Sequence, residues 1–192
     1  MRPSTTFRDA ALGPQAVFRT LLDALARPGR VLTLEGDVPA PPPPAGAALY
    51  AAALALVDFE TPLWLDAALA PLAEDLRFHT GAPVVDDPAR AAFALVAEPD
   101  SLPPLDAFAQ GTAAYPDRST TLIVEVRGFR DGPWRLAGPG LQAPRGFGAV
   151  GLDEAFAAQW RANHGRFPCG VDLFLTSGSQ VVGLPRTCRI EG

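Results

Sequence analysis

Two short segments of this chain combine arginine with hydroxyl side chains, a pairing that suits the oxygens of a phosphate or phosphonate. Arg77, His79 and Thr80 occupy the last turn of an expected helix, and Arg186 and Thr187 come directly after an expected strand. Arg77 and Thr80 are three residues apart, so on a helix they can face one ligand. A planar guanidinium group binds two oxygens of an anion at once. We therefore predict an anion-binding site built from these five residues, for a nucleotide or phosphonate ligand.

The same arginines also admit a purely structural interpretation. Arg77 and Arg186 would then pair with Asp58, Glu60 or Asp172 and satisfy polar groups that are partly buried. Asp58 and Glu60 could share one face of a strand, as an acid-base pair requires. The residues that follow them also fit a capped helix end, and for these two carboxylates we favour that structural role.

All 16 basic residues of the 192-residue chain are arginines, and the sequence contains no lysine. Schiff-base chemistry and the phosphate-binding lysine of a P-loop both need a primary amine, which a guanidinium group cannot replace. The composition therefore excludes covalent amine catalysis and P-loop nucleotide hydrolysis by this chain.

Cysteine and histidine are scarce, which bears on metal binding. Cys169 and Cys188 are the two cysteines, and His79 and His164 are the two histidines. An iron-sulfur cluster normally needs three or four thiolates, and none of these four residues has the close spacing that zinc sites use. We expect no metal centre. We expect free thiols, with a disulfide or redox switch between the two cysteines as the alternative.

The net charge of −5 is unevenly distributed along the chain. Residues 1–117 carry 7 arginines and 15 acidic residues, whereas residues 118–192 carry 9 and 6. Proteins that bind nucleic acid usually have a dense basic stripe and a high pI, but the pI here is about 5.0. We therefore expect no nucleic-acid partner.

Two further patterns bear on location and on hydrolase chemistry. The longest apolar run, 46–57, is shorter than the roughly 20 residues of a membrane span, and the first eight residues lack the apolar region of a secretory signal. We expect no membrane span and a cytoplasmic protein. Residues 177–179, Ser-Gly-Ser, fit the tip of a hairpin better than the strand-to-helix elbow of a serine hydrolase.

Hydrophobic periodicity and turn residues predict the elements that must position these groups. We expect helices from Pro14 to the stop at 27–29, over 47–57, over 69–80 and over 153–163, with short helical pieces at 88 and 105–110. The expected strands are 31–34, 63–65, 83–85, 93–97, 120–127, 134–137, 171–176 and 180–184, and residues 39–44 and 141–150 are expected as loops.

The order of these elements predicts one α/β domain over residues 1–192. Its sheet should be mixed, with a mostly parallel first half. Two antiparallel hairpins should complete it, one from 120–127 with 134–137 and one from 171–176 with 180–184.

Several segments, in chain order and spanning nearly the whole sequence, resemble the carbon-phosphorus lyase subunit PhnH family. The segments are 18–22 (FRTLL) with 27–29 (RPG), 58–65 (DFETPLWL), 76–80 (LRFHT) with 82–83 (AP), 111–113 (GTA), 167–168 (FP) with 170–173 (GVDL), and 184–187 (LPRT). The loop 39–44 and the arginine-rich stretch 127–135 match nothing in the family that we can identify.

The resemblance implies a subunit of the bacterial core complex that degrades phosphonates, together with subunits of the G, I and J types. That complex transfers methylphosphonate to the ribose C1 of ATP and releases adenine, which gives α-D-ribose 1-methylphosphonate 5-triphosphate. The resemblance also implies a homodimer when isolated and a three-layer αβα fold similar to that of pyridoxal-phosphate-dependent transferases. Because the chain has no lysine, the internal aldimine of those transferases cannot form, and we expect no cofactor.

The role that remains is a structural or co-catalytic one, and we expect the chain to be inactive alone. We expect Arg77, His79, Thr80, Arg186 and Thr187 to converge near a subunit boundary, where they bind an anion or order that boundary. The alternative is a free-standing enzyme that processes a nucleotide or phosphate ester in an arginine-lined pocket.

Overall fold

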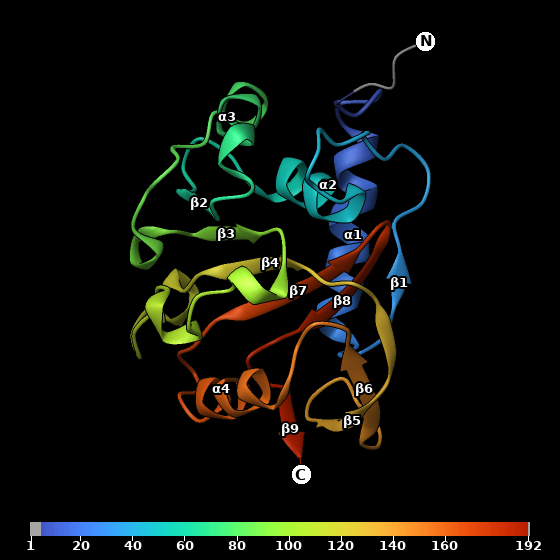
Figure 1. The fold of residues 1–192 in the computed structure, drawn as a ribbon, viewed down its shortest axis with the longest axis vertical. Coiled ribbons are helices and arrows are strands. Elements are labelled where there is room, and N and C mark those ends of the chain that lie inside the picture. The colour runs from blue at the N-terminus through green and yellow to red at the C-terminus, as the bar shows by residue number, and fades with distance from the viewer. Residues whose placement is uncertain (1–4, 192) are drawn as a thin grey trace.

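A six-stranded β-sheet lies in the middle of the molecule, in a computed structural model that describes residues 5–191 (Figure 1). In spatial order its strands are β1 (Leu32–Thr33), β8 (Gln180–Leu184), β7 (Asp172–Ser177), β4 (Thr121–Glu125), β3 (Phe93–Val96) and β2 (Leu63–Leu65). Strands β2, β3, β4 and β7 run parallel, β8 is antiparallel to β7, and β1 is antiparallel to β8. The predictions of an α/β protein with a mixed sheet and of the second hairpin are confirmed.

Three helices cover one face of this sheet: α1 (Leu12–Ala26), α2 (Ala47–Leu56) and α3 (Ala73–Thr80), with the short 3-10 helix η1 (Ala70–Leu72) leading into α3. On α1 the buried side chains recur at helical spacing, and Val17 and Leu21 face the core. Helix α2 is almost entirely alanine and leucine and lies between α1 and α3, packed on β4 and β7, so its side chains are buried on most sides. Its apolar composition is therefore that of a core helix.

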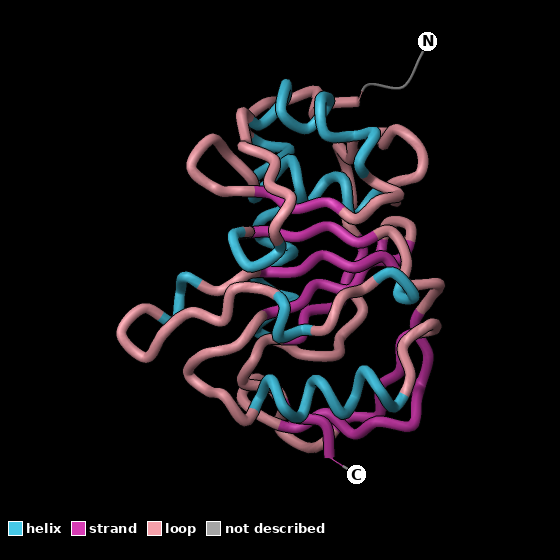
Figure 2. The backbone as a smooth tube through the Cα atoms, turned by 60° about the vertical axis from the view of Figure 1, so that its left-hand side comes forward, coloured by secondary structure: helices cyan, strands magenta, loops and turns pink. Residues whose placement is uncertain are grey.

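The opposite face carries a second layer, visible at the bottom of Figure 2. It contains α4 (Glu154–His164) and a three-stranded sheet of β6 (Arg145–Ala149), β5 (Phe129–Ala137) and β9 (Arg189–Glu191). Trp160 and Phe156 of α4 stack with ring centroids 6.2 Å apart, and Trp134 of β5 packs on Phe156 at 5.7 Å. These large rings fill the space between the helix, the small sheet and the main sheet.

The middle positions of the central strands β3, β4 and β7 are apolar because both faces of these strands are buried there. On β4, Leu122 and Val124 face the layer that contains α4, whereas Ile123 faces the three helices. Such a continuous apolar run is typical of a parallel strand covered on both sides. It explains why the alternation that marks a hairpin strand is missing here.

The first predicted hairpin is wrong. Strand β4 pairs with β3 and β7, and β5 instead joins the second sheet, where it pairs with β6 and β9. The chain leaves the main sheet at Arg127 and Gly128. The backbone of these two residues forms hydrogen bonds with Val150, the residue that follows β6. The turn residues at 130–132 lie inside β5, at an irregularity in its register, and not at a reversal of the chain.

Other boundaries also differ from the sequence prediction. Residues 145–149 form β6 where a loop was expected, and β9 was not predicted; both strands are short and rich in glycine or charge. The expected strand 83–85 is a single bridge between Val84 and Leu63, since Pro83 has no N–H to continue a ladder. The predicted helix 105–110 shortens to η4 (Leu105–Ala107).

Several predicted elements are confirmed at their ends by the expected capping groups. The Asp153 side chain accepts a hydrogen bond from Phe156 N and begins α4, and the Asp87 side chain accepts from Ala89 N at the start of η2 (Pro88–Arg90). Further single turns are η3 (Pro99–Ser101) and η5 (Pro116–Arg118). Within residues 5–191, no helix has the length and apolar content to cross a membrane.

Candidate functional site

The five predicted anion-binding residues form two groups at one edge of the main sheet. Helix α3 ends at Thr80, and the chain then returns to the start of β2, where Pro83 O accepts from Leu63 N. The other group lies beside Asp172, the first residue of β7. Leu63 and Asp172 are at the same level of the sheet, because residues paired in register connect them across β3 and β4. Both groups therefore lie at the amino-terminal edge of the parallel strands.

The two groups do not touch in the described part of the chain. Strands β3 and β4 lie between β2 and β7, and three interstrand steps amount to about 14 Å. Within residues 5–191, no hydrogen bond or ion pair joins the residues at the end of α3 to Arg186 or Thr187. That one ligand spans both groups therefore stays a prediction, and each group has to be judged by its own contacts.

Arg186 uses all of its guanidinium donors within the chain. Nε donates to both Asp172 oxygens at 3.1 and 3.2 Å, and Nη2 donates to Asp172 Oδ2 and, at 2.6 Å, to Ser119 Oγ. Nη1 donates to the carbonyls of Pro116 and Pro168 at 2.8 and 3.3 Å. A guanidinium group has five N–H donors, and all five are occupied here.

The surroundings of Arg186 show what this network does. Its side chain is 13% exposed, and the Asp172 side chain is 20% exposed. The backbone is fixed as well, because Arg186 N donates to Asp172 Oδ1 and Arg186 O contacts His164 Nδ1 at 2.9 Å. The arginine thus ties η5, the loop after α4 and the end of β8 to the start of β7, which confirms the structural interpretation for this residue.

The group at the end of α3 contains a chain of polar contacts between two helices. Tyr50 of α2 is fully buried, and its hydroxyl donates to Asp75 Oδ2 at 2.5 Å. The other carboxylate oxygen of Asp75 lies 3.6 Å from His79 Nε2. Burial, with the hydrogen bond and charge of Asp75, raises the pKa of Tyr50 above its ordinary value, so its hydroxyl stays a donor. Tyr50 and Asp75 were missed in the sequence; the four-residue spacing of Asp75 and His79 was the available signal.

Thr80 and Arg77 differ in whether their side chains are free to bind a ligand. The Thr80 hydroxyl donates to Leu76 O at 2.7 Å and accepts from Ala82 N at 3.1 Å, which fixes the end of α3. Arg77 is exposed, and its side chain makes no ion pair or hydrogen bond among residues 5–191. In this group, therefore, Arg77 is the cation still able to bind an external anion.

The carboxylates considered for acid-base chemistry have structural roles. Asp58 Oδ1 accepts from Glu60 N at 2.9 Å, and Thr61 Oγ1 accepts from Asp58 N at 2.7 Å. These contacts hold a tight turn before β2, where sequence analysis favoured a capped helix end; α2 already ends at Leu56. Neither Asp58 nor Glu60 contacts Arg77 in the described residues.

A partly buried carboxylate that sequence analysis missed lies at the opposite edge of the sheet. Glu125, the last residue of β4, accepts from Thr176 Oγ1 at 2.7 Å and from Gly178 N at 3.1 Å. Burial raises the pKa of Glu125, and these two hydrogen bonds partly oppose the increase. Because both donors belong to the β7–β8 hairpin, the carboxylate holds the tip of that hairpin against β4.

The two cysteines differ in burial: Cys188 is buried, whereas Cys169 is partly exposed. Both are free, and burial raises the pKa of Cys188 to about 12, which disfavours its reactive thiolate. Cys188 O accepts from Trp160 Nε1 at 2.9 Å, so this segment anchors α4. Within residues 5–191, no group of three or more His, Cys, Asp and Glu side chains is arranged to hold a metal ion.

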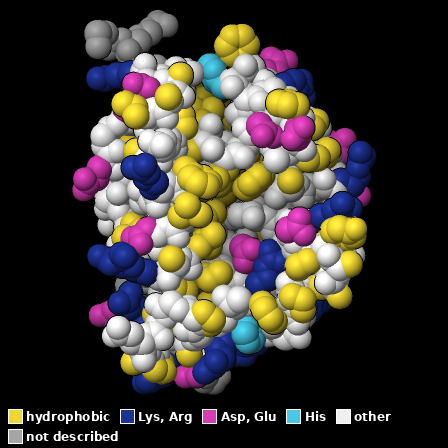
Figure 3. All heavy atoms as spheres, turned by 180° about the vertical axis from the view of Figure 1, so that it is seen from behind, with side chains coloured by type: hydrophobic (Ala, Val, Ile, Leu, Met, Phe, Trp, Pro, Cys, Tyr) yellow, Lys and Arg dark blue, Asp and Glu magenta, His cyan; other side chains and the backbone are white. Residues whose placement is uncertain are grey.

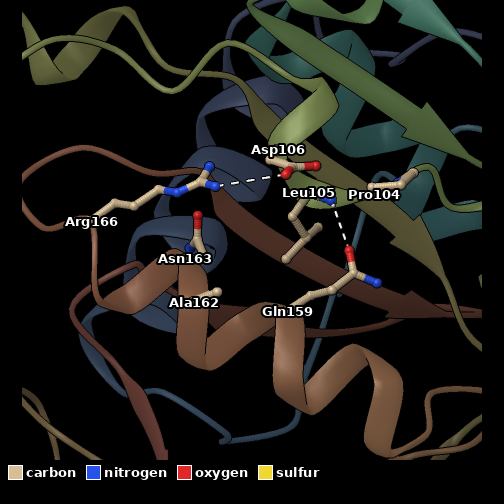
Figure 4. A pocket seen from close by; sticks show the side chains of 7 residues that line it. All are labelled: Pro104, Leu105, Asp106, Gln159, Ala162, Asn163 and Arg166. Atoms are coloured by element: carbon tan, nitrogen blue, oxygen red, sulfur yellow. Dashed lines mark hydrogen bonds and ion pairs between the residues drawn. The ribbon is translucent and has the colours of Figure 1, made fainter.

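A small pocket lies between α4 and η4, and polar side chains that line it already bind other residues of the chain (Figure 4). Its volume is about 170 Å³, below the roughly 300–1,000 Å³ typical of ligand sites. Gln159 Oε1 accepts from Leu105 N at 2.9 Å, and Arg166 lies 3.7 Å from Asp106. The pocket therefore marks how α4 is joined to the chain before β4, and we do not assign it a ligand.

Comparison with known proteins gives consistent relatives over nearly the full length. A family model described as "Bacterial phosphonate metabolism protein (PhnH)" matches residues 5–191. The chain is 42% identical over 191 residues to the alpha-D-ribose 1-methylphosphonate 5-triphosphate synthase subunit PhnH of Rhizobium meliloti (strain 1021), covering 98% of this chain and 95% of that protein. It is 34% identical over 179 residues to the putative C-P lyase subunit protein HtxG of Stutzerimonas stutzeri, covering 92% and 85%.

Proposed function

The chain belongs to the PhnH family of bacterial phosphonate metabolism proteins, and from this membership we propose that it is a subunit of the C-P lyase core complex. In that complex it supports phosphonate utilisation through the synthesis of α-D-ribose 1-methylphosphonate 5-triphosphate. The reaction transfers methylphosphonate to the ribose C1 of ATP and releases adenine. The observation that carries this conclusion is the 42% identity with a synthase subunit across 98% of the chain.

Within the complex we assign this chain a structural or co-catalytic role. The absence of lysine rules out an internal aldimine, so the residues present do not fit pyridoxal phosphate as a covalently held cofactor. Arg186 is saturated by Asp172, Ser119 and two carbonyl groups. These contacts support a role for Arg186 in fixing the fold.

Exposed apolar side chains support a role in assembly. Figure 3 shows hydrophobic side chains gathered down the middle of one face of the molecule. Phe78 of α3 is 84% exposed and Phe59 before β2 is 72% exposed, and Leu12 and Leu22 extend outward from α1. Contiguous exposed apolar patches, such as the one in this view, are typical of surfaces that bind other proteins.

Finer features of the assignment follow from the family resemblance. We propose that the chain forms one domain, is a homodimer when isolated, lies in the cytoplasm, and meets subunits of the G, I and J types in the complex. We also propose that its fold is a reduced form of the pyridoxal-phosphate-dependent transferase fold. For the predicted anion site, we keep a ligand role for Arg77, whose guanidinium group has no partner in the described residues.

Co-expression with the other core subunits tests the proposed function. We expect the chain to copurify with tagged subunits of the G, I and J types as one stable complex. Phe78 on α3 is 84% exposed and Phe18 on α1 is 43% exposed. Phe78→Ser and Phe18→Ser each remove one of these apolar side chains and show which surface is needed. Failure of the unmodified chain to join any of the three subunits would contradict the assignment.

A further inference from the structure

Four arginines gather where the end of α1 meets the small sheet, a region that neither the predicted anion site nor the family resemblance explains. Arg30 and Arg145 line two adjoining hollows of about 400 and 470 Å³. Arg130 lines the first hollow and Arg27 the second. Figure 1 shows the end of α1, β1, β5 and β6 together at this corner of the molecule. Both volumes fall in the range typical of ligand sites.

Close backbone packing builds this corner. The chain turns after α1 at Gly29, whose φ of +73° favours glycine, and Gly29 N donates to Gly183 O at 3.3 Å. On the other side, a Cβ at Gly140 would overlap the carbonyl oxygen of Ala26 and lie 2.9 Å from Pro28 Cδ. The loop after β5 is therefore pressed against the end of α1, and the two arginine-bearing segments are held side by side.

The strand register directs Arg145 toward the same corner. Arg145 begins β6 opposite Leu136 of β5, and it shares a face of the strand with Phe147, which is buried. A Cβ at Gly29 would lie 3.7 Å from Arg145 Cδ, so the aliphatic stem of this arginine passes close to the turn after α1. Its side chain thus spans the gap between the small sheet and that turn.

The charges at this corner are not balanced. Among the described residues, the side chains of Arg30, Arg130 and Arg145 make no ion pair or hydrogen bond, whereas Arg27 pairs with Asp23 at 3.0 Å. Asp131 is the acidic residue that lines the first hollow, and no acidic residue lines the second. The hollows therefore combine several free guanidinium donors with a net positive charge.

We propose that these two hollows bind a polyphosphate group, with Arg30 and Arg145 at the centre of the site. A guanidinium fork holds two phosphate oxygens, and two adjoining hollows that share two arginines suit a row of linked phosphates better than a single one. The choice of a nucleotide-like triphosphate as the physiological ligand rests on the proposed function. The anion site itself rests on the geometry of this corner.

Titration of the isolated full chain with inorganic tripolyphosphate, followed by calorimetry, tests the proposal. We expect binding that weakens as salt is added, and at least tenfold weaker binding in the double variant Arg30→Gln with Arg145→Gln. Arg19→Gln with Arg90→Gln is the matched control, because it removes two exposed arginines elsewhere whose side chains have no partner in the described part of the chain. Thermal unfolding of each variant verifies that the fold is unchanged. Orthophosphate and methylphosphonate serve as single-anion comparisons and should bind more weakly.

The outcomes separate this proposal from the proposed function. Absence of tripolyphosphate binding, or equal affinity in the two double variants, would overturn the site even if the chain still joins the core complex. Unchanged tripolyphosphate binding by Arg30→Gln with Arg145→Gln, together with loss of copurification, would show a protein-docking surface and also overturn it. Binding that depends on these two arginines in a chain that fails to join the complex would support the site and reject the subunit assignment.

Discussion

The partly buried Arg186 and the exposed pair Arg30 and Arg145 show two opposite uses of the same side chain. Arg186 directs all five N–H donors to Asp172, Ser119 and two backbone carbonyls. Arg30 and Arg145 line open hollows and have no side-chain partner among residues 5–191. The difference teaches that an arginine beside a hydroxyl in the sequence is not by itself a sign of ligand binding. What decides is whether neighbouring acceptors already use the donors.

Removing the partner of the buried arginine should have the largest effect. Asp172→Ala leaves the Arg186 charge largely buried and unpaired, and breaking such a pair costs about 3–5 kcal/mol of unfolding free energy. Chemical denaturation of the wild type and the variant measures this loss. A loss below about 1 kcal/mol would show that the network does not hold the four segments together.

A smaller loss is expected at the contact between α2 and α3. Tyr50→Phe removes the hydroxyl that donates to Asp75, and a hydrogen bond to a charged group contributes about 1.5–3 kcal/mol. Thermal and urea unfolding give the change, with Tyr115→Phe, whose ring is exposed, as a control. Equal stability of Tyr50→Phe and the wild type would contradict the role of Asp75 as a link between the helices.

The Glu125 carboxylate should make stability depend on pH. Its pKa in the folded protein is raised above the ordinary 4.5, so the folded state favours the protonated form. This contribution to stability is complete below pH 4.5 and is lost as the pH rises through the raised value. Relative to Glu125→Gln, the wild type should lose about 1 kcal/mol or less over that range. Melting curves from pH 4 to 8 measure the difference; a relative gain by the wild type with rising pH would show that the hydrogen bonds outweigh burial.

The exposed arginines should contribute least to stability. Arg30→Gln with Arg145→Gln is expected to change the unfolding free energy by no more than about 0.5 kcal/mol, as is usual for surface substitutions without partners. The same denaturation assay used for Asp172→Ala gives the value. A loss near that of Asp172→Ala would remove the contrast between the two regions and show that these arginines also fix the fold.

Local sequence signals predicted the elements that have clear ends. Proline, aspartate and glycine at their expected positions marked α1, α4 and the end of α3, and Gly81 does take the left-handed conformation that ends α3. Period-two and continuous apolar runs marked β2, β3, β7 and β8. The pairing of β4 could not be predicted, because its apolar run fits both a hairpin and a parallel strand until its partners are known.

The contacts of the candidate site residues could be predicted less well than the fold, for a related reason. Arg186 and Arg77 look alike in the sequence, yet one meets Asp172 and the other meets no partner in the described residues. Asp172 is 14 positions from Arg186, and Ser119 is 67 positions away. Partners so far apart in the sequence can be identified only when the order of the strands is known. The corner with Arg30 and Arg145 was hidden for the same reason, since β6 was expected as a loop.

Adenine release from ATP in the presence of methylphosphonate tests most directly whether this chain works as a subunit. The assay compares the isolated chain, the G, I and J type subunits without it, and the mixture of all four. We predict no release by the isolated chain and a clear increase in release when the chain is added to the other three. Turnover by the isolated chain in a clean preparation, or no change when it is added to its partners, would contradict the account.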